Sequence, residues 1–390
     1  MQYVKINPQK PDSGIIDRAV KVLKKGGIIV YPTDTLYGLG VDVNNVQAVY
    51  KLYLLKQRDL RLPISLMVAS IEDMEKISGK PDERTRTILT RMLPGKFTVL
   101  LNRKKGLNLA AFDEFLPEEA SSKIGFRIPD SPLCQQISAV LGNPISSTSA
   151  NISGKGNLQS VRDIVAHFGD KLDLILDAGA LPSKAGSTII DLTKTPLLVK
   201  REGDISLAEV RKLLNDPSVQ KSKDTYTITF VCSGNICRSA MAEGLLKALM
   251  KRTKFRSIVA VNSAGTLALP SSPAHETAIK IAAEQGVDIR THRSRFITKQ
   301  IVEQADLIIA MARDHLEYLQ KRFPEHRKKV VLLKEWKRNQ PLFNPSIADP
   351  IGHDPQFFRE VFNGIRIEIK RIMPYLFEEI KKFMDYNDIG

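Results

Sequence analysis

One strand–loop–helix segment constrains the fold of this 390-residue chain more than any other feature. Residues 225–231 (TYTITFV) have the composition of a buried strand, and residues 239–252 (SAMAEGLLKALMKR) have the spacing of a helix. The short segment 232–238 (CSGNICR) connects them, so its backbone amides and the first helical turn can converge on an anion. Gly234 and Asn235 tolerate the left-handed backbone that such a tight loop requires. The segment therefore predicts an α/β unit with an anion-binding loop.

The same loop carries side chains suited to nucleophilic chemistry. Cys232 would lie near Arg238 and the helix N-terminus, the environment in which protein thiols become nucleophiles. The guanidinium of Arg238 can bind two phosphoryl oxygens, and Ser239 can donate a hydrogen bond to the sulfur. A buried structural cysteine beside a capping arginine is the alternative, while a zinc site is disfavoured because Cys232 and Cys237 lack a companion pair of ligands. The expected cradle for phosphate consists of Ser233, Gly234, Asn235, Ile236, Cys237 and Ser239.

This segment resembles the low-molecular-weight protein tyrosine phosphatases, whose C-x5-R-S loop also follows the first strand of the domain. The resemblance runs through most of 226–383 and includes MAEGLL after the loop, SAGT at 263–266 and the pair Asp349-Pro350. It implies a parallel-sheet α/β domain in which Cys232 forms a phospho-cysteine intermediate with a phosphoprotein substrate and no cofactor is needed. It also implies that Asp349 protonates the leaving oxygen and later activates water.

Two positions bear on the substrate of this half. Ile236 is similar to the residue of phosphotyrosine-type members, whereas related protein-arginine phosphatases tend to carry Thr there. Ile351-Gly352 stand where tyrosine phosphatases commonly place aromatic residues. We expect phosphotyrosine to be preferred, with a protein-arginine phosphatase as the alternative. Cys237 could form a reversible disulfide with Cys232 or be a small buried residue, and no cysteine follows it, which argues against the arsenate reductases of this fold.

The N-terminal half alternates helical and strand-like segments. A helix is expected at 15–25, where paired glycines end it, and a buried strand follows. Further strand-like segments lie at 99–102, 124–129, 173–179 and 187–193. The polar, aperiodic stretch 216–224 is expected to be a linker. The sequence thus predicts two unrelated α/β domains, residues 1–215 and 225–390, joined by residues 216–224.

Polar islands in the N-terminal half are suited to binding anions, although the sequence contains no Walker phosphate loop. Lys56, Arg58 and Arg61 place three cations close together, enough to hold a triphosphate if they face a cleft. A solvated helix end is the alternative. The hydroxyl-rich stretch 146–151 can hydrogen-bond phosphates or a carboxylate, or be a plain turn, and residues 33–35 form a third polar island.

Together these elements resemble the YrdC-like threonylcarbamoyl-AMP synthases over nearly all of residues 5–215. The matching motifs are YPTDTLYGLG (31–40), KQR (56–58), PGKFTVLL (94–101), GFRIPD (125–130), Ser149-x-Asn151, GSTIIDLT (186–193) and REGDIS (201–206). The resemblance implies a twisted open α/β sheet and a reaction in which ATP with Mg²⁺, L-threonine and bicarbonate give threonylcarbamoyl-AMP and pyrophosphate. The product supplies the threonylcarbamoyl group of a modified tRNA adenosine, so tRNA and tRNA-modification proteins are candidate partners.

Carried over by position, this resemblance implies two groups of site residues. The nucleotide would be bound by Lys56, Arg58, Ser149, Asn151 and Arg201. Threonine or its carbamoyl intermediate would be faced by Thr33, Arg127, Ser147 and Ser187. Leu62 and Met67 depart from residues that relatives carry, which bears on the geometry of the phosphate grip. An RNA- or nucleotide-binding module is the alternative to a synthase.

Charge and cysteine content narrow the setting of the protein. The net charge of +15 suits nucleic acid, nucleotides or phosphorylated proteins, or else a solvated lysine-rich surface. Three cysteines cannot form a disulfide framework, no apolar run is long enough to cross a membrane, and the N-terminal residues lack the pattern of a secretory signal. We expect a cytoplasmic protein without a membrane partner.

Overall fold

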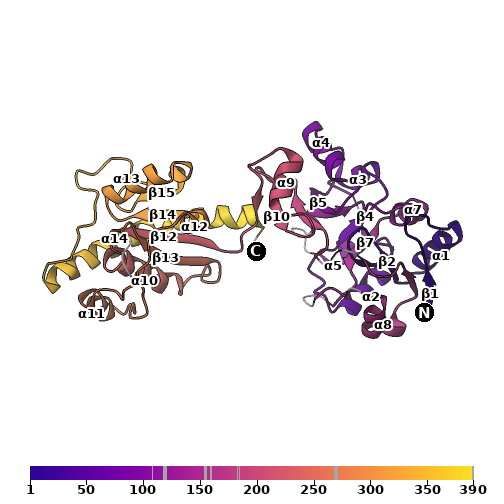
Figure 1. The fold of residues 1–390 in the computed structure, drawn as a ribbon, viewed down its shortest axis with the longest axis horizontal. Helices are drawn as coiled ribbons and strands as arrows, with labels where there is room; N and C mark the ends of the chain where they lie inside the picture. Colours follow the sequence, from indigo (N-terminus) through magenta and orange to yellow (C-terminus); the bar gives the residue numbers. More distant parts are fainter. Residues whose placement is uncertain are drawn as a thin grey trace. The chain divides into compact units, whose positions relative to one another are not determined.

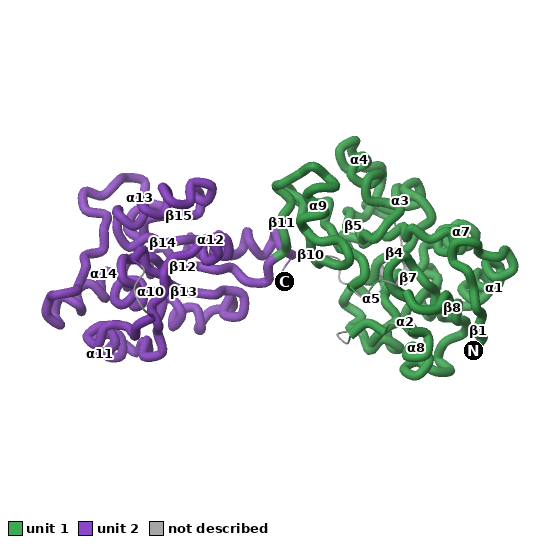
Figure 2. The backbone as a smooth tube through the Cα atoms, viewed as in Figure 1, with its two compact units in different colours: residues 1–222 green, residues 223–390 purple. Residues whose placement is uncertain are grey.

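The computed structural model describes residues 1–107, 109–116, 121–152, 156–158, 160–181, 183, 185–267 and 271–388. The chain forms two compact units, residues 1–222 and 223–390 (Figure 1, Figure 2). Among the described residues, no helix combines the length and the apolar character needed to cross a membrane.

The division between the units falls inside the segment 216–224, which the sequence analysis assigned to a linker. Its first part belongs to the first unit, because Val219 is fully buried in that core. The short strand β11 (Gln220–Lys221) then pairs in parallel with β10 (Leu198–Arg201). The apolar side chain of Val219 accounts for the difference, since its burial removes apolar surface from water.

The first unit is built on a mixed eleven-stranded sheet with the order β1-β8-β2-β3-β7-β4-β6-β5-β9-β10-β11. Its other strands are β1 (Gln2–Lys5), β2 (Ile29–Pro32), β3 (Tyr37–Gly40), β4 (Ser65–Met67), β5 (Phe97–Asn102), β6 (Lys123–Arg127), β7 (Ile145–Ser149), β8 (Leu174–Asp177) and β9 (Thr188–Asp191). Its helices are α1 (Ser13–Lys24), α2 (Val46–Lys56), α3 (Ile71–Ser78), α4 (Glu83–Met92), α5 (Ala110–Phe115), α7 (Pro132–Leu141), α8 (Val161–Phe168) and α9 (Leu207–Leu214), with a short 3-10 helix at Gly169–Lys171.

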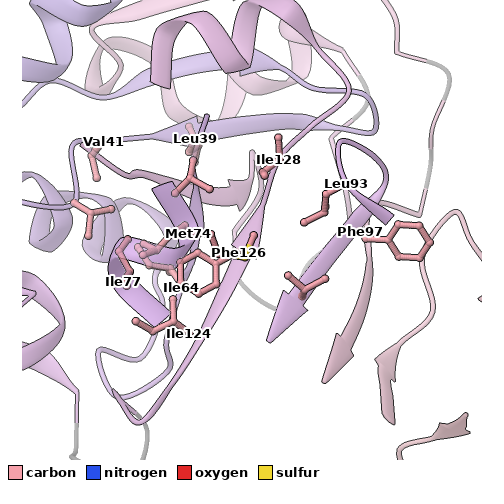
Figure 3. Close-up of a cluster of buried hydrophobic side chains, with 14 of the residues drawn as sticks. Leu39, Val41, Ile64, Met74, Ile77, Leu93, Phe97, Ile124, Phe126 and Ile128 are labelled. Atoms are coloured by element: carbon pink, nitrogen blue, oxygen red, sulfur yellow. The ribbon is translucent and has the colours of Figure 1, made fainter. Parts of the chain in front are cut away.

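Alternating side chains of this sheet fill two cores, one on each face. Ile29 and Tyr31 pack with α1 and α7, whereas Val30 between them joins a larger cluster. Figure 3 shows part of that larger cluster, in which Phe126 of β6 lies near Met74 of α3. The central strands therefore form a rigid support for the polar residues at their ends.

The second unit has a four-stranded parallel sheet with the order β13-β12-β14-β15. The strands are β12 (Tyr226–Cys232), β13 (Val259–Gly265), β14 (Leu307–Ala310) and β15 (Val330–Leu332). The helices are α10 (Arg238–Met250), α11 (Glu276–Glu284), α12 (Lys299–Gln304), α13 (Arg313–Arg322) and α14 (Pro355–Asn387), with a 3-10 helix at Pro324–Lys329. Phe230 and Val231 of β12 enter the two different cores of this unit. The α/β class and the parallel sheet predicted from the sequence are confirmed.

Candidate active sites

The loop after β12 is held in shape by a buried asparagine. Asn235 has a φ of 57°, the left-handed conformation that the sequence predicted there. Its side-chain amide donates to Ser239 Oγ at 2.9 Å and to Ser263 Oγ at 2.7 Å. Its backbone oxygen accepts a hydrogen bond from His292 Nε2 at 2.7 Å. The backbone amide of Arg295 also donates to Asn235 Oδ1 at 3.0 Å. Hydrogen bonds between Asn235 and four residues thus fix the curvature of the loop.

The end of β13 lies directly against this loop, and only a glycine fits there. A Cβ atom on Gly265 would come within 2.5 Å of the Ser233 carbonyl oxygen and within 3.2 Å of Asn235. The adjacent Thr266 amide donates to the Cys232 carbonyl at 2.9 Å. The SAGT segment therefore supports the loop from behind.

Around the loop the structure brings together the predicted nucleophile, arginine and acid. Cys232 Sγ lies 3.0 Å from Ser239 Oγ. Arg238 is buried, and its Nη2 donates to Asp349 Oδ2 at 2.5 Å and to Ser233 Oγ at 3.1 Å. Asp349 is itself exposed, so a group that can transfer protons stands at the open side of the cradle.

The other loop residues take different positions. Ile236 is half-buried against the core cluster of the second unit, with its carbonyl accepting from the His275 amide at 2.9 Å. Cys237 is buried, and burial followed by the neighbouring Cys232 raises its pKa to about 12. The Cys237 thiol is therefore protonated at neutral pH in this arrangement.

Two histidines that the sequence analysis missed contact the loop. His292 binds the Asn235 carbonyl, and buried His315 shares a 2.8 Å hydrogen bond between its Nε2 and Ser233 Oγ. Because Arg238 donates to Ser233 Oγ, the serine hydroxyl is free to donate to His315. Burial lowers the pKa of His315 well below its usual value, so the ring is neutral. Neither histidine belongs to a local motif, and their rarity was the available signal, since the chain has six.

In the first unit, the predicted residues surround one cavity of about 490 Å³. Its lining includes Thr33, Lys56, Arg58, Arg127, Ser147, Ser149, Asn151, Ser187 and Arg201, which are all the residues assigned to this site from the sequence. Four of these, Lys56, Arg58, Arg127 and Arg201, are basic residues, and no aspartate or glutamate lies among the described lining residues. The cavity is therefore electrostatically suited to a polyanion.

Lys56 fixes the hydroxyl-rich segment on one side of the cavity. The lysine ends α2 and is buried, and its Nζ donates to the carbonyls of Ser149 and Asn151 at 2.6 Å each. Burial, followed by the charge of Arg58, lowers the pKa of Lys56 to about 7. Arg61, which was expected to face a cleft together with Lys56 and Arg58, is not a lining residue. Its guanidinium instead forms an exposed ion pair with Asp59 at 2.7 Å.

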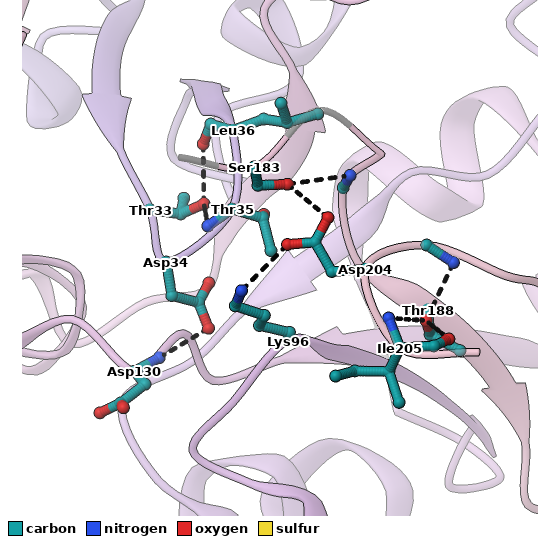
Figure 4. Close-up of polar contacts among 12 residues, drawn as sticks. Thr33, Asp34, Thr35, Leu36, Lys96, Asp130, Ser183, Thr188, Asp204 and Ile205 are labelled. Carbon is teal, nitrogen blue, oxygen red and sulfur yellow. Dashed lines mark hydrogen bonds and ion pairs between the residues drawn. The ribbon is translucent and has the colours of Figure 1, made fainter. Parts of the chain in front are cut away.

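On another side, an arginine joins the turn at residues 33–35. Arg127 Nη2 donates to Asp34 Oδ1 at 2.6 Å and to Thr33 Oγ1 at 3.1 Å, while its Nε has no partner among the described residues. Asp34 Oδ2 in turn accepts from the Asp130 amide at 3.1 Å (Figure 4). Arg127 thus joins the turn at residues 33–35 to the wall of the cavity.

The remaining wall is formed by Ser187 and the segment that begins at Arg201. Arg201 Nη2 donates to the Ser187 carbonyl at 2.9 Å, and burial followed by the charge of Arg127 lowers the pKa of Arg201. Asp204 anchors the segment by accepting from Lys96 at 3.1 Å and from Ser183 at 2.6 Å (Figure 4). Lys96 of the Pro-Gly-Lys turn is thus a structural residue in this network.

Comparison with known proteins finds similarity in both halves. The Sua5_yciO_yrdC family model, described as telomere recombination, matches residues 21–203. The family model of low molecular weight phosphotyrosine protein phosphatases matches residues 227–384. A putative threonylcarbamoyl-AMP synthase of Methanocaldococcus jannaschii is 32% identical over 199 residues, which are 51% of this chain and 90% of the relative.

Two solved structures are similar to the second half. The YwlE arginine phosphatase of Geobacillus stearothermophilus is 32% identical with a TM-score of 0.36, and the match covers 40% of this chain and 96% of that protein. A low molecular weight protein tyrosine phosphatase of T. tengcongensis is 28% identical with a TM-score of 0.36, and the match covers 39% of this chain and 99% of that protein.

Proposed function

Since the chain belongs to the Sua5/YciO/YrdC family through its first unit and to the low-molecular-weight phosphotyrosine protein phosphatase family through its second, we propose that it is a bifunctional enzyme. The first unit synthesises threonylcarbamoyl-AMP from ATP, L-threonine and bicarbonate for tRNA modification. The second unit hydrolyses phosphorylated proteins through a phospho-cysteine. All three cysteines are free and buried, which agrees with a reducing cytoplasm.

The observation that supports the synthase is the cavity of the first unit, whose described lining includes four basic side chains and no carboxylate. Arg58 and Arg201 would bind the nucleotide phosphates together with Ser149 and Asn151, whereas Lys56 would position Ser149 and Asn151, since its ammonium already donates to both. Arg127 would bind the carboxylate of threonine or of its carbamate beside Thr33, Ser147 and Ser187. Hydroxyl and amide oxygens without carboxylates suit a Mg²⁺ ion that arrives on ATP and keeps most of its ligands from phosphate and water.

In the proposed reaction, threonine carbamate attacks the α-phosphorus of ATP. A bond forms between the carbamate oxygen and phosphorus, the bond to the bridging oxygen breaks, and pyrophosphate leaves with the electron pair. The protein contributes position and charge, because the cations hold the phosphates in line and neutralise the developing negative charge.

Pyrophosphate release by the full chain tests this half of the proposal. We expect release from ATP that requires both L-threonine and bicarbonate and that persists in Cys232→Ser. A chain that binds ATP or RNA but releases no threonine-dependent pyrophosphate would instead be a binding module, and the synthase proposal would be lost.

The observation that supports the phosphatase is the loop after β12, which places Cys232 against Ser239 and Arg238 against Asp349. The Cys232 sulfur attacks phosphorus, Asp349 protonates the departing oxygen, and Arg238 binds two of the phosphoryl oxygens. Water activated by Asp349 then releases phosphate, while the hydrogen bond from Ser239 stabilises the departing sulfur. Because Arg238 Nη2 also binds Asp349, the substrate has to share or replace that ion pair.

For the substrate we propose phosphotyrosine, with phosphoarginine as the second candidate. Half-buried Ile236 presents an apolar branched side chain at the loop, which suits an aryl ring and leaves the N–H donors of a guanidinium without partners. Ile351-Gly352 after Asp349-Pro350 favour the second candidate, because these residues offer no aromatic ring to sandwich a phenyl group. Matched phosphotyrosine and phosphoarginine peptides distinguish the two, and a higher kcat/KM for phosphoarginine would contradict our assignment.

A further inference from the structure

Another cavity, of about 320 Å³, lies in the phosphatase unit and has no role in the proposed chemistry of either unit. It lies between α10, the end of β13 and the loop around residues 288–295. Cys232, Arg238 and Asp349 are not among its lining residues. The side chains at its wall that matter here are Glu243, Asn262, Arg293 and Arg295.

The acceptors at this cavity are already used. Glu243 accepts from Ser263 Oγ at 2.5 Å and from Lys247, and its Oε2 lies 3.6 Å from His292 Nδ1. Burial alone would raise the pKa of Glu243, yet these hydrogen bonds lower it to about 2. The carboxylate of Asp288 pairs with Arg290 at 2.7 Å. A cation entering the cavity would therefore find no free carboxylate.

The donors, in contrast, are left open. Arg295 Nε donates to the Ser263 carbonyl at 2.8 Å, and Arg293 Nη1 donates to the His292 carbonyl at 2.7 Å. Within the described part of the chain, neither arginine lies within ion-pair distance of a carboxylate. The side-chain oxygen of Asn262, Oδ1, accepts a hydrogen bond from Thr229 Oγ1 at 2.7 Å. The N–H groups of the same side-chain amide therefore point away from Thr229. The cavity thus combines satisfied acceptors with unpaired guanidinium donors.

We propose that this cavity binds a small free oxyanion of the phosphate class at a site separate from the phosphate loop. Two guanidinium groups match the planar edges of such an anion, and charge-assisted hydrogen bonds are the stronger ones available to it. Because both arginines are exposed to solvent, half-saturation is expected on the order of 1–10 mM.

The site is coupled to the phosphate loop through Asn235. His292 of the cavity wall donates to the backbone carbonyl of Asn235, and Ser263 Oγ accepts from the side-chain amide of Asn235. The backbone amide of Arg295 donates to Asn235 Oδ1. An anion on Arg293 and Arg295 restrains the segment that holds Asn235 in its left-handed conformation. Occupancy therefore raises kcat of the phosphatase; this coupling rests on the proposed function, whereas the binding itself does not.

Binding can be measured on the full chain without catalysis. The probe is inorganic phosphate, and the reporter is the imidazole of His292, resolved by histidine-selective labelling because the chain has six histidines. In Arg238→Met, which removes the primary phosphate grip, we expect a saturable shift of the His292 signal. The double variant R293A/R295A should weaken it by at least about tenfold, whereas the matched control R252A/R256A, with the same change of charge on exposed arginines elsewhere in the unit, should not.

A His292 signal that does not respond to phosphate, or that responds equally in R293A/R295A, overturns the proposal. If Arg238→Met does not fold, the same pair of double variants is compared in the unsubstituted chain. Phosphate at the loop then shifts the His292 signal in both, and only the additional shift that R293A/R295A lacks reports the cavity of the phosphatase unit. For the coupling, phosphate added to a p-nitrophenyl phosphate assay should raise kcat in the R252A/R256A chain and not in R293A/R295A, beside competitive inhibition at the loop. Purely competitive inhibition in both variants contradicts the coupling. If the chain has no phosphatase activity, the proposed function fails, but the His292 titration still tests anion binding because it needs no catalysis.

Discussion

In the second unit one contiguous loop, residues 232–238, supplies the nucleophile, the amide cradle and the arginine, and one distant residue, Asp349, completes the site. In the first unit the lining residues come from positions between Tyr31 and Arg201, and no segment forms the site alone. In the proposed functions, the loop of the second unit performs covalent chemistry and depends on a few atoms. The cavity of the first unit would hold a large anion by many weak contacts and depend on their sum.

This difference predicts unequal sensitivity to substitution. A change to a group that forms or breaks a bond in the loop site should cost several orders of magnitude in rate. A change to one cation of the cavity should cost about one charge-assisted hydrogen bond, because the neighbouring cations remain.

Asp349→Asn should give the largest graded effect. Without a proton donor, turnover of an alkyl phosphate should fall by about 10²–10⁴, whereas an acidic leaving group such as p-nitrophenol should lose much less. Measuring kcat for a series of leaving groups provides the test. An equal loss for every leaving group would show that Asp349 acts only through its ion pair with Arg238.

Arg58→Ala should reduce kcat/KM for ATP in threonine-dependent pyrophosphate release by about ten- to a hundredfold, since one charge-assisted hydrogen bond contributes roughly 1.5–3 kcal/mol. The matched control is Arg61→Ala, because Arg61 pairs with Asp59 and is not part of the lining. Equal losses in the two variants would mean that the cavity does not bind the nucleotide through Arg58.

His315 should make the stability of the second unit depend on pH. Burial lowers its pKa in the folded chain, so below the ordinary value of about 6.5 the unfolded chain binds a proton that the folded chain does not. The contribution of neutral His315 to the free energy of unfolding should be fully present above that pH. It should decrease as the pH drops below it, by about 1.4 kcal/mol for each pH unit.

The single tryptophan of the chain, Trp336, lies in the second unit and reports its unfolding in urea. Comparing pH 7 with pH 5 should show this loss in the native chain and a smaller loss in His315→Gln, whose amide can still accept from Ser233. An identical loss in both chains would remove His315 as its source.

Ile236→Thr should give the smallest effect. Replacing an apolar branch by a hydroxyl offers a partner to a guanidinium, so the ratio of kcat/KM for phosphoarginine over phosphotyrosine peptides should rise by up to about tenfold. Ile236→Val is the control, because it keeps the branch and adds no hydrogen-bonding group. An unchanged ratio in Ile236→Thr would show that this residue does not set specificity.

The contrast between the two sites also explains what could be predicted from the sequence. The loop of the second unit is contiguous, so its anion cradle and the left-handed Asn235 could be predicted from local residue types. His292 and His315 could not, because they reach the loop only through packing of distant segments.

In the first unit, the resemblance predicted which residues share the cavity, while the geometry was not readable from the chain. Lys56 donates to backbone carbonyls of the hydroxyl-rich segment, and Arg61 turns away to Asp59, although the two cations stand close together in the sequence. The first unit also extends to Ser222 because buried Val219 outweighs the polar character of its neighbours.

We propose that the two active sites of this chain work independently of each other. The most direct measurement assays both activities on full-length Cys232→Ser. We predict that hydrolysis of p-nitrophenyl phosphate falls by about 10⁴-fold or more, while threonine- and bicarbonate-dependent pyrophosphate release stays within about twofold of the native chain. Loss of pyrophosphate release in this variant, or survival of the phosphatase activity, would contradict the account.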